Sequence, residues 1–275
     1  MKAWIKNNLT TVILAVVFLG GLCLLLYPSL ADYWNSFHQS QAISSYAETV
    51  AAIDNDEYER IWNDAVNYNK NLARRGFKLG LSPEEAKVYD KTLDVTGTGI
   101  MGYIEIPEIR CNLPIYHGTD ESVLQIAIGH LPGTSLPVGG IGTHCVLSGH
   151  RGLPSAKLFT NIDQLVEGDL FVIRTMYETL TYEVDQIRIV LPDEVEDLKP
   201  DPNEDYCTLV TCTPYGVNSH RLLVRGHRTD NVLDQIRVTA DAQVIDAMFV
   251  APMVAAPILL GLLVGVMATT RKKKN

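Results

Sequence analysis

The stretch TLVTCTPYG, residues 208–216, runs from a strand-like segment into a sharp interruption and holds one cysteine between the two. Thr, Leu and Val at 208–210 favour a β-strand, whereas the Pro-Tyr-Gly that follows favours a turn. Because side chains alternate along a strand, Cys212 shares a face with Val210, and Cys207 takes the other face. We therefore predict that Cys207 is a small buried residue and that the Cys212 thiol, at the strand end, can reach solvent.

Short runs of similar texture recur from Gly97 to Arg228, each rich in Val, Ile, Tyr or Thr and separated from the next by Gly and Pro. They read GIMGYIEIP (99–107), CNLPIYHG (111–118), GTHCVLSG (142–149), DLFVIRT (169–175), LTYEVDQIRIVLP (180–192), YCTLVTCTP (206–214) and HRLLVRGHR (220–228). Six or more such runs at close spacing predict an all-β barrel or sandwich.

Residues 40–92 are predicted to be helical, because Ala, Tyr, Ile and Val recur at spacings of three and four and no Pro or Gly occurs before Gly76. A further helix is expected to begin at Ser82, a candidate N-cap that Pro83 follows. We expect these helices to pack on the β-rich part of the chain. The alternative is a partly disordered stalk.

Two uncharged apolar runs, residues 7–31 and 247–270, each exceed the roughly 20 residues needed to cross a bilayer. Lys2 and Lys6 precede the first run, and RKKK (271–274) follows the second. Because cationic flanks stay in the cytoplasm, we predict cytoplasmic termini and one extracytoplasmic domain between two transmembrane segments. Two alternatives stay open: a cleaved signal peptide for the first run and a buried core helix for the second.

The chain therefore divides into four predicted parts: an N-terminal membrane segment at 1–31, a helical region at 32–96, a β-rich catalytic domain at 97–238, and a C-terminal transmembrane helix with a basic tail at 239–275. Six of the 23 lysines and arginines lie in the two tails, whereas all 32 acidic residues lie between them, so the part between the tails has a net charge of −15. Nucleic acid is excluded as a partner because its recognition needs a basic face.

The cysteines give a further constraint on the chemistry. Cys23 lies in the first apolar run, and the four others are Cys111, Cys145, Cys207 and Cys212. Four cysteines outside the membrane are compatible with two disulfides. The sequence contains no CxxC motif, so a zinc ribbon or a thioredoxin-like site has little support. We predict no metal and no cofactor.

A nucleophilic thiol needs a base or a cation nearby. Of the seven histidines, His150 stands between two glycines just after the run THCVLS, and loops at strand ends often hold catalytic residues. His144 lies inside that run and is expected to be structural. His130, in IGHLPGT, is predicted to lie in a loop and stays a second candidate.

Acyl transfer also needs a group that stabilises the oxyanion. A hairpin through TPYGVNS would bring Arg221 beside Cys212. Arg225 would lie two pleats further along the same face, about 13 Å away. Spacing therefore favours Arg221, although either arginine could instead form a surface ion pair.

Together, TLVTCTPYG, NSHRLLVRG, VLSGHRGLPSAKLFT and MGYIEIPEI followed by LPIYHGT resemble the sortase family, and most of all its class C, pilin-polymerising branch. The resemblance runs from about Gly97 to Arg228. It implies an eight-stranded β-barrel and a cysteine transpeptidase that needs no metal. Matched position by position, Cys212 corresponds to the nucleophile, His150 to the general acid and base, and Arg221 to the residue that stabilises the oxyanion.

The resemblance also implies the partners. The substrate would be an LPXTG-like sorting signal, cleaved between Thr and Gly, and the acceptor would be a pilin lysine amine. Two alternatives are a sortase that attaches proteins to a peptidoglycan amine and a surface scaffold without activity. The intact set of Cys212, His150 and Arg221 argues against the scaffold.

The sequence departs from class C in one place. Members of that branch usually have a lid with an Asp-Pro-aromatic motif before the barrel, and RRGFKLGLSPEEAKVYDKTLDVTG (74–97) contains no Asp-Pro pair. A lid built on that motif is therefore absent or altered. We expect Cys212 to be open in the resting protein, or only weakly covered by residues 77–96.

Overall fold

A computed structural model describes residues 9–231, 255–261 and 264–265. The chain divides into two compact units, of which Asn35–Arg237 is one and contains every strand described below. Helix α2 (Leu9–Ala51) contains one segment that is long and apolar enough to cross a membrane, with a mean hydropathy of 2.7. Most of the second predicted transmembrane run, residues 247–270, lies outside the described residues, so that run stays a prediction.

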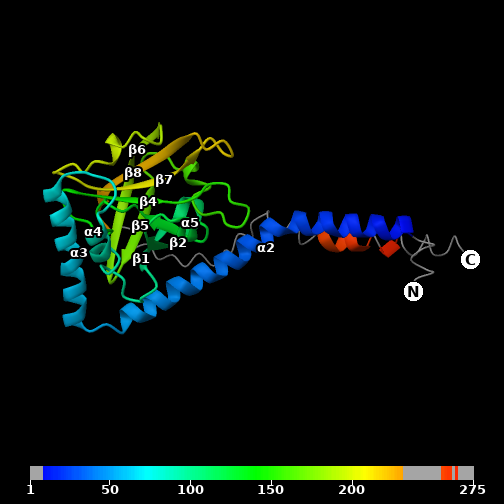
Figure 1. Ribbon diagram of the computed structural model, residues 1–275, viewed down its shortest axis with the longest axis horizontal. Helices are drawn as coiled ribbons and strands as arrows, with labels where there is room; N and C mark the ends of the chain where they lie inside the picture. Colours follow the sequence, from blue (N-terminus) through cyan, green and yellow to red (C-terminus); the bar gives the residue numbers. More distant parts are fainter. Residues whose placement is uncertain (1–8, 232–254, 262–263, 266–275) are drawn as a thin grey trace, which may run out of the picture. The chain divides into compact units, whose positions relative to one another are not determined.

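Eight strands form a closed barrel. Most of them are labelled in Figure 1. They are β1 (Ile100–Ile106), β2 (Cys111–His117), β3 (Ile128–His130), β4 (Thr143–Ser148), β5 (Leu170–Thr175), β6 (Glu178–Val190), β7 (Asp205–Thr213) and β8 (His220–Thr229). Around the barrel their order is β1-β2-β3-β4-β7-β8-β6-β5. The prediction of an eight-stranded barrel is confirmed.

The pairing of β4 with β7 places the ends of these two strands, where His150 and Cys212 are found, next to each other. These strands are parallel neighbours, with Ser148 opposite Val210, although β5 and β6 separate them in the sequence. Strand β7 then pairs antiparallel with β8. Because parallel strands end at the same edge, the residues that follow β4 lie beside those at the end of β7.

The barrel interior is filled by the inward side chains that strand alternation predicts. Cys207 and Leu209 of β7 point into this core, together with Cys145 and Leu147 of β4. Cys207 has no exposed surface, so the prediction that it is buried is confirmed.

Helices precede and interrupt the strands. After α2 come α3 (Asn55–Arg75) and α4 (Pro83–Tyr89), while the short α5 (Glu121–Leu124) and the 3₁₀ turns η1 (Pro107–Ile109), η2 (Ile162–Gln164) and η3 (Glu196–Leu198) lie between strands. Helix α4 begins as predicted: Ser82 accepts a hydrogen bond from the Glu85 backbone, and the Glu85 carboxylate accepts one from Ser82 N in return. This capping box satisfies two backbone donors at the helix start.

The helices pack on the barrel, as expected, and do not form a disordered stalk. Buried Tyr46 of α2 donates through Oη to Met101 O at 3.1 Å and accepts from Met176 N at 2.8 Å. The Asn69 side chain of α3 bonds to both backbone groups of Leu136, at 3.1 and 2.8 Å. Helix α3 stands beside the barrel in Figure 1.

Candidate active site

Cys212 lies one residue before the end of β7, on the outer face of the barrel. Alternation places it on the same side as Val210 and opposite to Cys207 and Thr211. Its side chain is partly exposed, whereas Cys207 is buried. Of the two cysteines on this strand, only Cys212 therefore has a thiol that a substrate can reach.

Arg221 is the residue directly opposite Cys212 in the β7·β8 pairing. Its Nη1 donates to the backbone oxygens of Asn218 (3.3 Å) and His220 (3.1 Å), and within residues 9–231 its guanidinium has no carboxylate partner. The structure thus places Arg221 where the hairpin prediction put it, with donors left for a substrate oxygen.

Arg225 is engaged elsewhere. It lies opposite Thr208 and makes two hydrogen bonds to the Asp185 carboxylate, at 3.0 and 2.8 Å. Its guanidinium also stacks over Tyr206 at 4.1 Å from the ring centre. A fork held by a carboxylate and an aromatic ring is a structural ion pair, so the geometry separates the two arginines as spacing had predicted.

His150 follows β4 by two residues, as Cys212 follows Val210 by two. The parallel register continues past the strand, because Gly149 N donates to Val210 O at 3.0 Å and the Thr211 hydroxyl donates to Gly149 O at 2.7 Å. The backbone of His150 is therefore level with that of Cys212. The three predicted site residues therefore lie at the same end of the barrel.

Glu121 is a neighbour of His150 that sequence reasoning missed. Its Oε2 lies 3.6 Å from His150 Nε2, and it comes from the first position of α5. The Glu121 side chain is 71% exposed, so solvent screens this pair and its contribution is small. No feature of the sequence near residue 121 marked it as a partner of a histidine 29 positions later.

Arg151 links the loop after β4 to the loop after β7, and it was also missed. Its side chain is only 11% exposed and pairs with Asp163. Its Nη1 donates to Thr213 Oγ1 at 3.3 Å, and its guanidinium lies 5.9 Å from the centre of the Tyr215 ring. Arg151, the residue after His150, therefore contacts Thr213 and Tyr215, which follow Cys212 in the sequence.

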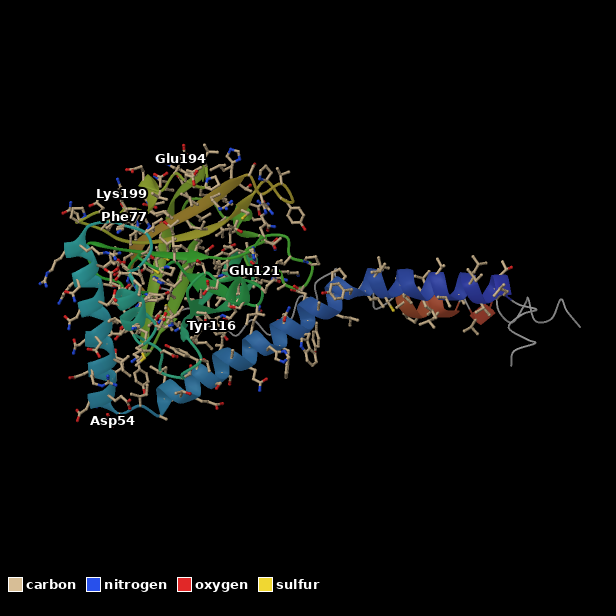
Figure 2. All side chains as sticks on the ribbon, viewed as in Figure 1. Asp54, Phe77, Tyr116, Glu121, Glu194 and Lys199 are labelled. Atoms are coloured by element: carbon tan, nitrogen blue, oxygen red, sulfur yellow. The ribbon has the colours of Figure 1, made fainter. Side chains whose placement is uncertain are left out.

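A second apolar cluster covers the outer face of the same strands. It is built on Val146 of β4, Leu223 of β8 and Leu198 of η3, and we call it the outer-face cluster. Val210 packs against it, two residues before Cys212. Phe77, from the segment between α3 and α4, also packs against it and lies near Lys199 in Figure 2. The segment that lacks the lid motif thus contacts the face that bears Cys212.

The other two histidines considered are structural. His130 ends β3 and does not lie in a loop, which corrects that prediction: it is fully buried, with Nδ1 3.0 Å from Tyr89 Oη and Nε2 2.8 Å from Ser135 O. Its environment excludes contact with a substrate. His144 is buried inside β4, as expected, and burial lowers its pKa to about 4.

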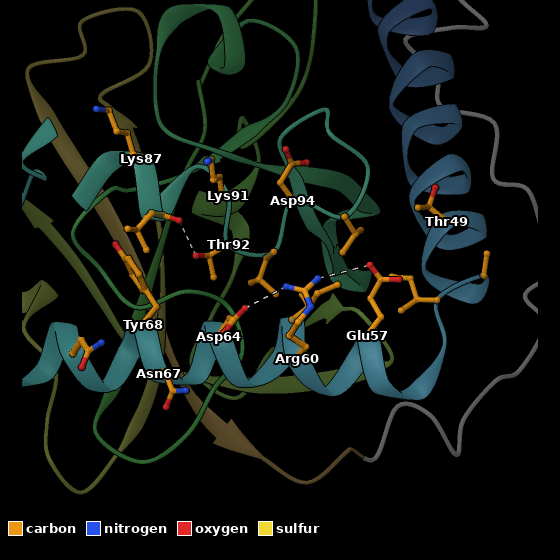
Figure 3. Close-up of a pocket in the computed structure, with 17 residues that line it drawn as sticks. Thr49, Glu57, Arg60, Asp64, Asn67, Tyr68, Lys87, Lys91, Thr92 and Asp94 are labelled. Carbon is orange, nitrogen blue, oxygen red and sulfur yellow. Dashed lines mark hydrogen bonds and ion pairs between the residues drawn. The ribbon is translucent and has the colours of Figure 1, made fainter. Parts of the chain in front are cut away.

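One cavity lies away from these residues. Its volume is about 800 Å³, and Figure 3 shows it between α3 and the segment from α4 to Val95. Arg60 spans part of it through ion pairs with Glu57 (3.7 Å) and Asp64 (3.5 Å). A smaller cavity of about 650 Å³ adjoins the site and is lined by Arg151, Thr213 and Tyr215 among others. Within the described residues, no group of three or more His, Cys, Asp or Glu side chains is arranged for metal binding.

A closed eight-stranded barrel with a thiol, an imidazole and a guanidinium at one end is a framework for covalent thiol chemistry. The sortase domain model matches residues 104–229. Sortase C1 from Streptococcus agalactiae is 52% identical, with a TM-score of 0.68 over 70% of this chain and 99% of that one. Sortase C from Streptococcus pneumoniae is 42% identical, with a TM-score of 0.62 over 69% and 97% of the two chains.

Sortase D from Bacillus subtilis is 31% identical over 46% of this chain. The match spans 63% of that relative, slightly less than two thirds of its length. The 52% identity over 99% of the sortase C1 chain, together with the domain match, shows that this chain belongs to the sortase family.

Proposed function

We propose that this protein is a membrane-anchored, extracytoplasmic cysteine transpeptidase of the pilin-polymerising type. The observation that supports it best is the position of Cys212, Arg221 and His150 at the same end of the barrel. Its substrate is an LPXTG-like sorting signal, and its acceptor is a pilin lysine amine. The sortase C structures from Streptococcus agalactiae and Streptococcus pneumoniae are 52% and 42% identical to this chain, which favours this branch. The Streptococcus pneumoniae structure is described as giving insight into pilin substrate specificity.

In the first half of the reaction, the Cys212 thiolate attacks the carbonyl carbon of the Thr–Gly bond. Arg221, opposite Cys212, donates hydrogen bonds to the oxyanion that develops. His150 gives a proton to the glycine nitrogen as the C–N bond breaks, so that it leaves as a neutral amine. The product is a thioester between Cys212 and the threonine acyl group.

In the second half, the lysine amine attacks the thioester carbonyl, and His150 takes the proton that the amine loses. The C–S bond breaks and returns the Cys212 thiolate, while an isopeptide bond forms. All groups in this scheme belong to the protein and its two substrates, so no cofactor is needed.

The proposal includes the topology. Residues 1–31, with the apolar part of α2, would form the N-terminal membrane anchor. Residues 32–96 and 97–238 would lie outside the membrane. Residues 239–275 would form a second anchor with a cytoplasmic tail. Attachment of the acyl group to a peptidoglycan amine is the second candidate, because the same thioester could be resolved by either amine.

The test is incubation of the full-length protein, in detergent, with a purified pilin that contains the sorting signal. We expect covalent ladders on a denaturing gel, absent with Cys212→Ala. A ladder-free reaction in which a peptidoglycan-derived amine is joined to the signal would favour the second candidate. Failure with both acceptors would contradict transpeptidation.

A further inference from the structure

Cys145 and Cys207 lie directly opposite each other on neighbouring strands. They are partners in the parallel register of β4 and β7, and both point into the barrel interior. Cys145 is 2% exposed and Cys207 is fully buried. Neither cysteine has a role in the proposed reaction, because Cys212 lies on the opposite face of β7.

Both residues are free thiols in the structure, and both belong to the buried core of the barrel. Cys111, in contrast, pairs across the β1·β2 ladder with Ile106 and has no cysteine opposite it. Of the four cysteines outside the predicted membrane segments, only these two are placed to react with each other.

The spacing of the strands permits a covalent bond. Neighbouring strands lie about 4.8 Å apart, and disulfides occur at Cα separations of roughly 4.4–6.8 Å. The sequence separation of the two residues also matters: a bond that closes a loop of about 60 residues removes much of the conformational freedom of the unfolded chain.

We propose that Cys145 and Cys207 form a disulfide that links β4 to β7 when the domain folds outside the membrane. One thiolate attacks the disulfide of an exported thiol–disulfide oxidoreductase, and one thiolate of that oxidant leaves. The second cysteine thiolate then attacks the mixed disulfide and releases the other. Two thiols thus lose two protons and two electrons, and the oxidant disulfide becomes a dithiol.

The bond must form before the barrel closes, because burial of both sulfurs keeps an oxidant away from the folded core.

The position of the disulfide in β4 and β7 determines its effect on the candidate active site. Cys145 lies five residues before His150, and Cys207 lies five residues before Cys212, so the link would fix the register that brings those two residues level. The inference rests on the proposed topology for its oxidant, but it does not depend on transpeptidase activity.

The test uses the full-length chain with Cys111→Ser and Cys212→Ala. These changes are needed because trypsin leaves Cys111 with Cys145 in one peptide, and Cys207 with Cys212 in another. The protein is produced by export, and a second sample is refolded in detergent with oxidised and reduced glutathione. Free thiols are blocked with N-ethylmaleimide under denaturing conditions, and the digest is measured by mass spectrometry.

We expect the two peptides to be linked in most molecules, and the link to disappear on reduction. The Tm of the linked protein should exceed that of its reduced form by about 10 °C, given the loop that the bond closes. Cys207→Ser should abolish the link and leave Cys145 open to N-ethylmaleimide.

Recovery of both cysteines as N-ethylmaleimide adducts, in exported and refolded samples with a native circular dichroism spectrum, would overturn the inference. Measuring both the link and ladder formation on the wild-type chain distinguishes a failure of this inference from a failure of the proposed function. Ladders without the link would contradict only the disulfide, and the link without ladders would contradict only the transpeptidase.

Discussion

Two cysteines five positions apart on β7 have opposite environments. Cys212 is partly exposed on the outer face, whereas burial raises the pKa of Cys207 far above its ordinary value. We expect Cys212→Ala to abolish transpeptidation with the fold intact, because the covalent route needs its sulfur. Ladder formation with purified pilin measures the loss, and circular dichroism checks the fold.

Cys207→Ala is the matched control on the same strand. It removes a buried sulfur and should lower stability while leaving measurable activity. Loss of activity in Cys207→Ala together with full activity in Cys212→Ala would mean that the other sulfur is the nucleophile.

Arg221 and Arg225 give a second comparison between like residues. Lysine keeps the charge but not the planar fork of donors, so Arg221→Lys should lower kcat by about 10²–10³-fold. Arg225→Lys should cost stability, because Arg225 is bound to Asp185, and should change kcat little. Steady-state kinetics on a sorting-signal peptide distinguishes the two, and equal effects would contradict the assignment of Arg221.

At the scale of single elements, β4 contains a pH-sensitive residue. The His144 Nε2 lies 2.7 Å from Thr208 Oγ1 and Nδ1 lies 3.0 Å from Lys199 O, in a buried site that lowers its pKa to about 4. The unfolded chain, with a pKa near 6.5, therefore binds more protons than the folded chain between pH 6.5 and 4. As far as His144 is concerned, the free energy of unfolding is therefore highest above pH 6.5 and decreases as the pH falls from 6.5 to 4.

We expect this residue to account for a loss of about 2 kcal/mol in the free energy of unfolding between pH 7 and pH 5. Urea unfolding of wild type and His144→Gln at both pH values measures it. The variant should be less stable at pH 7 but should lose less on acidification. His220→Gln, at a partly exposed histidine bonded to Ser219, is the control and should keep the wild-type slope. Equal slopes in all three proteins would contradict the role of His144.

Local patterns in the sequence predict several elements well. Alternation in β7 places Cys207 inside and Cys212 outside, and Ser82 with Pro83 fixes the start of α4. The sequence predicts a loop at His130, yet His130 ends a three-residue strand. Such a short strand has no period of its own, and its pairing with β2 and β4 is what defines it.

Long-range contacts account for what the sequence could not reveal. The parallel pairing of β4 with β7 joins residues about 60 positions apart, and this pairing is what brings His150 level with Cys212. Glu121 and Arg151 were missed for the same reason, because their partners come from other loops. The place of His150 in a loop at a strand end made it a candidate, and the resemblance of whole motifs implied its role.

At the scale of the whole molecule, the helical region and the barrel meet at the face that bears the site. Phe77 packs against the outer-face cluster, and Gly80 N donates to Pro132 O at 3.2 Å beside it. Gly133 approaches this segment so closely that an added Cβ would lie 2.8 Å from Lys78 O. The segment is therefore held on the barrel, although it lacks the Asp-Pro motif.

This arrangement separates access to the thiol from access to the outer-face cluster. Cys212 is partly exposed, so a small thiol reagent should reach it, in line with the open thiol that the sequence predicts. A sorting signal also needs room for the Leu-Pro residues before its reacting threonine. Val210, about 7 Å from Cys212 along β7, packs against the outer-face cluster, whose core residues are buried and which Phe77 contacts. Movement of Phe77 off this cluster would give the Leu-Pro residues an apolar surface.

We therefore predict that Phe77→Ala lowers KM for a sorting-signal peptide by about fivefold, because a larger fraction of molecules is competent to bind. The rate at which iodoacetamide modifies Cys212 should stay within about twofold of wild type.

Phe77→Leu, which keeps an apolar side chain, is the matched control, and Tm values verify that all three proteins are folded. An unchanged KM would show that Phe77 does not compete with substrate. A tenfold faster modification of Cys212 in Phe77→Ala would show that this segment also covers the thiol, and the prediction of an open site would be wrong.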